Sequence, residues 1–149
     1  MEPRITLVTL GVANLDRART FYEEVLGWTA APQSVGDVVF FQAGGVVLSL
    51  YPRKLLAEDA RLADAGGTGF GGFTLAHNVR AREEVDRVLD DVARRGGRIL
   101  KPAEDAAWGG RSGYFADPDG VAWEVAWNPG LPLDAEGIPR LLAEPELEA

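Results

Sequence analysis

One carboxylate interrupts the apolar run that follows the Asp-Pro-Asp-Gly turn at residues 117–120. This carboxylate is Glu124, and its neighbours in the run are Trp123, Val125 and Trp127. A buried charge is costly unless a hydrogen bond or a counter-charge compensates it. Three roles therefore remain open for Glu124: a metal ligand, a ligand-binding or general-base carboxylate, and a structural carboxylate held by a hydrogen bond or an arginine. Strand alternation places the three apolar neighbours on the opposite face, toward the helices.

Few other residues have side chains suited to catalysis or metal binding. The chain has one histidine and no cysteine, which excludes disulfides and thiolate metal sites. Asp117 and Asp119 are explained by the chemistry of the turn itself. The glycine-rich stretch AGGTGFGG, residues 65–72, lacks the Gly-Lys-Ser/Thr ending of a phosphate loop and precedes a strand rather than a helix.

Length and charge narrow the class of protein. A chain of 149 residues with 46% hydrophobic residues is expected to form one compact domain. The net charge of −8 disfavours a nucleic-acid partner, because phosphates require a basic surface. No segment has the length and apolarity of a membrane span, and the N-terminus lacks the pattern of a signal peptide. We therefore expect a cytoplasmic protein without a membrane partner.

The order of predicted elements occurs twice. Residues 4–12 have the pattern of a strand, Asn14 is a candidate N-cap for the helix that follows, and Gly44-Gly45 marks a hairpin. A second strand, helix and strands follow from residue 70 onward, which indicates two fused βαβββ modules. We expect one domain at 1–130, with module one at about 4–52, a connector at 53–67 and module two at about 68–129, followed by a surface or frayed tail at 131–149.

Two motifs carry a resemblance to a known family. With GVANLDRARTFYEEVLGW near the start and GGRSGYFADPDGVAWEVAWNP near the end, the chain resembles the vicinal oxygen chelate superfamily of glyoxalase I, bleomycin-resistance proteins and extradiol dioxygenases. The resemblance covers roughly residues 4–129. It implies an α+β fold in which two tandem βαβββ modules form a half-open barrel around a cavity, and it implies a homodimer. It does not indicate the reaction, because one scaffold hosts many chemistries.

The family commonly holds a divalent metal with up to four side chains, two from each module. Carried over by register, these positions are Leu7, Ser49, Gly72 (or Phe73 if the register slips by one) and Glu124. Only Glu124 has a ligand-type side chain, whereas divalent metals require several oxygen or nitrogen donors. The resemblance thus implies a degraded metal site and no metal cofactor. His77 lies an odd number of residues after Gly72 and should face away from the cavity.

The same register predicts the lining of a small-molecule pocket. Aromatic walls with a few polar groups are typical of such pockets. The predicted ligand-binding residues are Leu7, Thr9, Phe41, Ser49, Tyr51, Phe73, Trp108, Arg111, Tyr114 and Glu124. Trp108 is consistent with ligand binding or with anchoring of its loop. Arg111 is consistent with pairing to Glu124, with binding an anionic ligand, or with a plain surface salt bridge.

Three functions are consistent with these features. The first is a small-molecule-binding protein, similar to the bleomycin-resistance branch, that works without a metal. The second is a lyase, isomerase or dioxygenase of the same scaffold that uses Glu124 as a base or metal ligand. The third is an interaction module whose cavity is vestigial.

Overall fold

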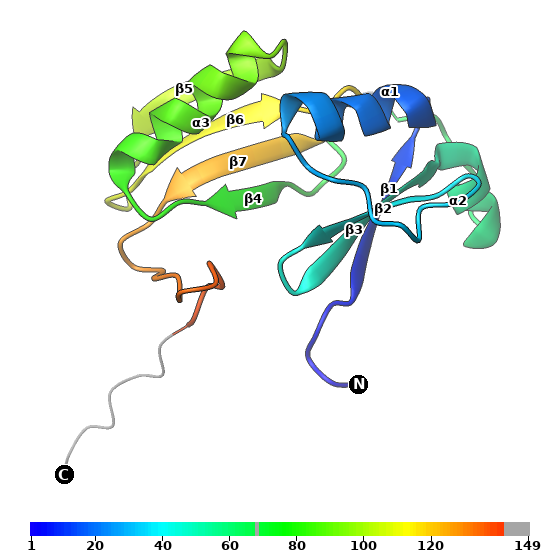
Figure 1. Cartoon of the computed structure of the whole chain (residues 1–149), viewed down its shortest axis with the longest axis horizontal. Helices are drawn as coiled ribbons and strands as arrows, with labels where there is room; N and C mark the ends of the chain where they lie inside the picture. The colour runs from blue at the N-terminus through cyan, green and yellow to red at the C-terminus, as the bar shows by residue number, and fades with distance from the viewer. Residues whose placement is uncertain (68, 142–149) are drawn as a thin grey trace.

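The chain folds as an α+β structure with two separate β-sheets, as expected from the sequence. The computed structural model describes residues 1–67 and 69–141. One sheet has three strands in the order β1-β3-β2, and the other has four strands in the order β4-β7-β6-β5. Within the described residues the two sheets do not close into a barrel. Figure 1 shows them side by side.

The first module supplies the three-stranded sheet. Its elements are β1 (Leu7–Val12), α1 (Leu15–Thr20), the π-helical turn η1 (Phe21–Val25), β2 (Val39–Ala43) and β3 (Val46–Pro52). Asn14 begins the helix as expected, because its side chain accepts a hydrogen bond from the Arg17 backbone N–H at 2.9 Å. Gly27 follows the helical segment with a φ of 73°, a conformation that favours glycine. β1 runs parallel to β3, and β2 is antiparallel to it.

The second module supplies the four-stranded sheet. The connector contains α2 (Arg53–Asp59), and the module comprises β4 (Leu75–Asn78), α3 (Arg82–Arg94), β5 (Arg98–Asp105), β6 (Arg111–Ala116) and β7 (Ala122–Trp127). Glu84, in the first turn of α3, accepts hydrogen bonds from the backbone N–H groups of Arg80 and Ala81 and so caps the start of the helix. One side of α3, which carries Val85, Leu89 and Val92, is buried.

Two of the helices, α1 and α3, cover the same side of the sheets (Figure 1). A Cβ atom at Gly113 of β6 would lie 2.4 Å from the side chain of Leu89, so glycine allows α3 to approach the sheet closely. Buried residues such as Phe115 and Val125 share this helix-covered face. We call the opposite side of each sheet its open face.

A buried hydrogen-bond chain joins the two modules. The Tyr22 hydroxyl donates to Asp117 Oδ2 at 2.8 Å and accepts a hydrogen bond from Trp123 Nε1 at 3.2 Å. Burial raises the pKa of both Tyr22 and Asp117. Asp119 Oδ1 also crosses to module one, where it accepts a hydrogen bond from the Ala13 backbone N–H at 2.9 Å. The Asp-Pro-Asp-Gly turn therefore reverses the chain and also joins module two to module one through the hydrogen bonds of Asp117 and Asp119.

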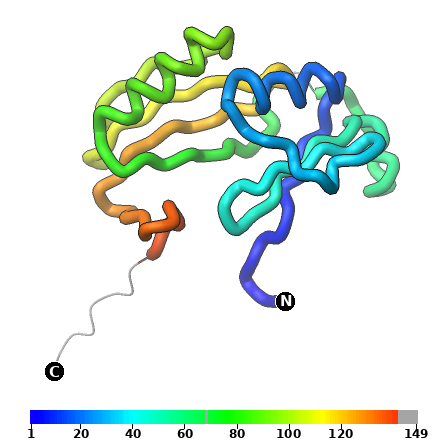
Figure 2. The backbone as a smooth tube through the Cα atoms, viewed as in Figure 1, coloured from blue at the N-terminus to red at the C-terminus, as the bar shows by residue number. Residues whose placement is uncertain are grey.

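The segment after β7 folds back on itself. Asp134 accepts hydrogen bonds from the backbone N–H groups of Glu136 and Ile138, and Arg80 donates to the Asp134 carbonyl oxygen. Figure 2 shows this segment on the side of the four-stranded sheet opposite α3. The expectation of a frayed tail falls, for residues 142–149, outside the described residues. No helix in the described part has both the length and the apolarity needed to cross a bilayer.

Replacing Tyr22 with phenylalanine should destabilise the protein. The substitution leaves an oxygen of Asp117 and the indole N–H of Trp123 buried without this partner, which costs about 1–3 kcal/mol. The wild type should also lose stability above about pH 10, because the unfolded chain releases the tyrosine proton that the folded chain retains. The slope from this group is about 1.4 kcal/mol per pH unit, and Tyr22→Phe should lack it.

Urea unfolding at a series of pH values measures both effects. Tyr51→Phe serves as the control, since Tyr51 is partly exposed. An alkaline slope that is identical in wild type and Tyr22→Phe would contradict the assignment of Tyr22 as a buried, protonated donor.

Candidate functional site

Glu124 and Tyr114 form a hydrogen-bonded pair on the open face of the four-stranded sheet. The two residues are cross-strand partners in β7 and β6, and the Tyr114 hydroxyl donates to Glu124 Oε2 at 2.9 Å. Both side chains are half-buried. Burial, with a further contribution from the Glu124 carboxylate, raises the pKa of Tyr114, which keeps its hydroxyl protonated as a donor. Trp123 and Val125 alternate onto the buried face, as the strand pattern predicted.

The residues around this pair follow from the strand register. Ala76 of β4 lies beside Glu124, and Lys101 of β5 lies opposite Tyr114. Ser112 of β6 lies two residues from Tyr114 and shares its face. The Lys101 ammonium is 3.0 Å from a carboxylate oxygen of Glu104. This face thus combines small, hydroxyl and aromatic side chains with the Glu124 carboxylate and the Lys101–Glu104 ion pair.

The open face of the three-stranded sheet contributes hydroxyl and aromatic groups. Thr9 and Ser49 are partners in β1 and β3, and the Ser49 hydroxyl donates to Thr9 Oγ1 at 3.0 Å. Leu7 and Tyr51 share this face by two-residue alternation. The register of β2 adds Phe40, which lies opposite Ser49.

Phe41 lies on the helix-covered face, although we expected it beside Ser49. It pairs with Leu48, is 1% exposed, and packs against the rings of Tyr22 and Trp28. The physical reason is the two-residue Gly44-Gly45 turn, which sets Ala43 opposite Val46 and hence Phe40 opposite Ser49. Counting outward from the turn would have identified Phe40 from the sequence.

Arg111 also lies on the helix-covered face and does not meet Glu124. Its guanidinium forms a bidentate pair with Asp86 of α3, with N–O distances of 2.7 and 2.8 Å, and lies 3.2 Å from Asp105. The Arg111 hydrogen bonds lower the pKa of Asp86. Of the three interpretations of Arg111, the structure supports the salt bridge, which ties α3 to the β5–β6 hairpin.

Trp108 lies in the loop between β5 and β6 and is 52% exposed. Its ring packs directly over Gly110: a Cβ atom there would lie 1.8 Å from the Trp108 ring and 2.3 Å from the Trp127 carbonyl oxygen. One part of the indole therefore anchors the loop while another part faces solvent.

The remaining predicted positions surround the start of β4. Phe73 is 49% exposed in the segment before the strand, and Gly72 precedes it with a φ of 88°. His77 pairs with Val125 and thus shares the helix-covered face, which agrees with the expectation that it faces away from Glu124. Neither Phe73 nor Gly72 forms part of the hydrogen-bonded strand that flanks Glu124.

The four register positions of the family's metal site do not suit a divalent metal. Leu7 and Gly72 have no donor side chain. Ser49 is 2% exposed and its hydroxyl is hydrogen-bonded to Thr9. One carboxylate oxygen of Glu124 already accepts a hydrogen bond from Tyr114. Within residues 1–67 and 69–141, no three His, Cys, Asp or Glu side chains gather closely enough to hold a metal ion. A site with several protein donors is what such metals require.

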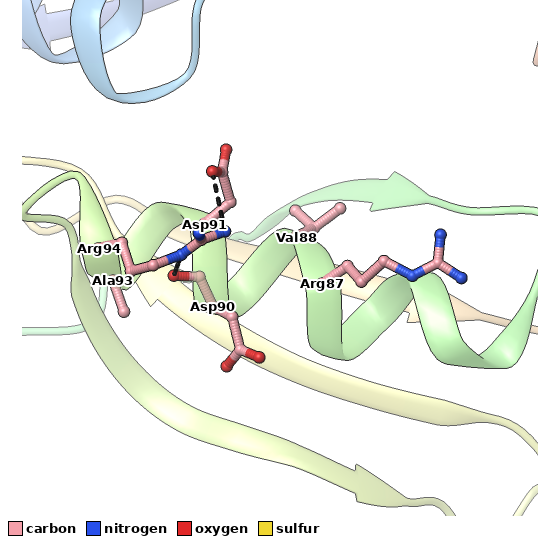
Figure 3. A pocket seen from close by; sticks show the side chains of 6 residues that line it. All are labelled: Arg87, Val88, Asp90, Asp91, Ala93 and Arg94. Atoms are coloured by element: carbon pink, nitrogen blue, oxygen red, sulfur yellow. Dashed lines mark hydrogen bonds and ion pairs between the residues drawn. The ribbon is translucent and has the colours of Figure 1, made fainter.

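Two surface hollows lie away from the Tyr114–Glu124 pair. One, of about 740 Å³, adjoins the Asp-Pro-Asp-Gly turn, and its wall includes Phe70, Leu100 and Asp119. The other, of about 660 Å³, follows the outer side of α3 (Figure 3), where Arg94 pairs with Asp91 at 3.3 Å. The second is the charged, solvated side of α3, which carries Arg87, Asp90, Asp91 and Arg94.

These features agree with comparisons to known proteins. The family model of the glyoxalase/bleomycin resistance protein/dioxygenase superfamily matches residues 4–125, and the chain belongs to this family. A glyoxalase-related enzyme from Fulvimarina pelagi is similar in structure, with a TM-score of 0.84 and 36% identity over 95% of this chain and 99% of that one. A family protein from Nocardioides has a TM-score of 0.74 and 26% identity over 85% of this chain and 84% of that one.

A related protein from Streptomyces peucetius is about twice as long as the segment that matches this chain. The anthracycline biosynthesis protein DnrV of Streptomyces peucetius is 27% identical over 144 residues, which is 93% of this chain and 52% of that protein. The chain thus spans about half the length of the curated relatives it matches.

Replacing Gly110 with alanine should disturb the Trp108 loop. The new methyl group would overlap the indole ring and a backbone oxygen that cannot move freely, and such overpacking costs about 1–3 kcal/mol. Intrinsic fluorescence and urea unfolding measure the change. Gly45→Ala is the matched control, because a Cβ atom there meets nothing within 4 Å. Equal stability of the two variants would contradict the packing of Trp108 on Gly110.

Proposed function

We propose that this protein binds a small organic molecule against the open faces of its sheets, and that it does so without a resident divalent metal. The observation that carries the proposal is the position of Glu124. Glu124 is a charged residue in an otherwise apolar strand, and it lies on the face that α3 does not cover. Its hydrogen-bond partner is a tyrosine rather than a cation. The fold gains little from a charge there, so a ligand is the better explanation.

The chemistry of the surrounding residues supports a ligand with apolar and polar parts. Phe40, Tyr51 and Tyr114 offer aromatic surface, and Thr9 offers a hydroxyl whose oxygen already accepts a hydrogen bond from Ser49. Such combinations are usual in small-molecule sites. The name of the Streptomyces peucetius relative refers to anthracycline biosynthesis, which makes fused-ring aromatic compounds the first ligand class to test.

Metal analysis of the purified protein tests the metal-free part of the proposal. We expect less than stoichiometric nickel, zinc, manganese and iron after supplementation with each ion, because the register positions supply one ionisable donor. Elemental analysis by mass spectrometry gives the stoichiometry. Bound metal that disappears in Glu124→Gln would overturn this part, favour the enzyme alternative, and lead to glyoxalase and dioxygenase assays.

Thermal unfolding with a library of fused-ring aromatic compounds tests the binding itself. A compound present at 100 times its Kd should stabilise the chelator-treated protein by about 2.7 kcal/mol, which raises Tm by a few degrees for a domain of this size. Tyr114→Ala should abolish the shift, since it removes both ring and hydroxyl from the open face.

Glu83→Gln is the control for the binding variants, because Glu83 is exposed in the first turn of α3. A shift that survives Tyr114→Ala would place the ligand elsewhere and contradict the proposed site. The absence of any shift across the library would favour an interaction module with a vestigial cavity. We also propose a cytoplasmic homodimer, which light scattering of the purified protein can test for its oligomeric part.

A further inference from the structure

The charge of Glu124 has no counter-ion in the part of the protein that the structure describes. Its Oε2 accepts the Tyr114 hydroxyl at 2.9 Å, and no described Arg, Lys or His nitrogen lies within the 4.0 Å of an ion pair. Tyr114 is a neutral donor, so it orients the carboxylate without cancelling its charge. The carboxylate therefore keeps both its charge and acceptor capacity for a further partner.

The nearby cations are engaged elsewhere. Lys101 lies across from Tyr114 on the same face, but its ammonium pairs with Glu104 at 3.0 Å. Arg111 lies on the other face, where Asp86 and Asp105 bind its guanidinium. The chain as a whole carries a net charge of −8, which adds to the negative potential at the sheet.

We propose that the ligand of this site carries a cationic nitrogen that pairs with Glu124, next to an aromatic ring system that lies against Tyr114. This inference rests on the proposed function and names the ligand class for the same face. A half-buried carboxylate attracts a cation more strongly than an exposed one does, because water screens it less. The electron-rich face of Tyr114 also favours a cation over a neutral or anionic group.

Tyr114 acts in this site as a positioning residue. Its hydroxyl donates to Oε2 of Glu124, which restrains the carboxylate and leaves Oε1 as an acceptor for an incoming donor. Tyr114→Phe retains the ring but removes the constraint. It should therefore weaken binding of a cation by several-fold and leave the affinity for an uncharged ring system nearly unchanged.

Three acridine probes of similar shape and different charge test the inference. They are 9-aminoacridine, which is cationic at neutral pH, acridone, which is neutral, and acridine-9-carboxylate, which is anionic. Fluorescence titration and calorimetry at low salt should give a Kd at least tenfold lower for the cation than for the neutral probe. Raising the salt concentration should reduce the affinity for the cation selectively.

Glu124→Gln is the decisive variant. The glutamine carbonyl can still accept the Tyr114 hydroxyl, so the fold should persist, and far-UV circular dichroism with urea unfolding verifies this. The variant should bind the cation at least tenfold more weakly and acridone within twofold of wild type. Glu83→Gln, which removes the same charge from an exposed position on α3, should change neither affinity.

The outcomes distinguish failure of the cationic ligand class from failure of the proposed small-molecule binding. Equal binding of neutral and cationic probes, with both lost in Tyr114→Ala, would overturn the cationic ligand class and leave the binding site standing. Cation binding that Glu124→Gln does not weaken would also overturn the inference. Failure of all three probes to bind would overturn the inference. The thermal-shift library would then test separately whether the protein binds any fused-ring compound.

Discussion

The hydroxyl of Tyr22 is the point on which the arrangement of the two modules depends. It comes from the helical segment of module one, donates to Asp117 in the turn of module two, and accepts from Trp123 at the start of β7. All three groups are buried. A hydrogen bond of this kind adds modestly to stability, but each of its groups would be costly to bury alone. The modules are therefore held in an arrangement that satisfies all three at once.

This arrangement also determines which surfaces remain for function. The helical segments and the helix-covered faces share one aromatic core, in which Tyr22 contacts Trp28, Phe41 and Trp123. On that side the apolar side chains pack against one another. No described helix packs against an open face to the extent that α3 packs against the other face of the four-stranded sheet (Figure 1). Glu124 follows Trp123 directly, so the alternation that buries the tryptophan in the core directs the carboxylate to the open face.

The sequence was most informative where one local rule decides the outcome. Asn14 predicted the start of the helix, and alternation separated Trp123 from Glu124, because capping and strand period depend on few residues. Phe41 lies on the helix-covered face, contrary to the expectation, because the Gly44-Gly45 turn sets a register that pairs Phe40 with Ser49. Two other features depend on distant parts of the chain: the irregular β5 register that brings Lys101 opposite Tyr114, and the second role of Asp117 as a partner of Tyr22. No pattern local to these residues contains that information.

Three of the four positions that the resemblance assigns to the family's metal site lie outside the core. Leu7 is 45% exposed, Gly72 precedes β4, and Glu124 is half-buried on the open face, so none of the three belongs to the core cluster. Changing such residues alters the chemistry of the face at little cost in folding free energy. By the same reasoning, the fold does not require the carboxylate at position 124. This independence from stability is what our proposal needs: a carboxylate that Tyr114 orients and that has no described counter-ion can recognise a ligand by charge and hydrogen bonding.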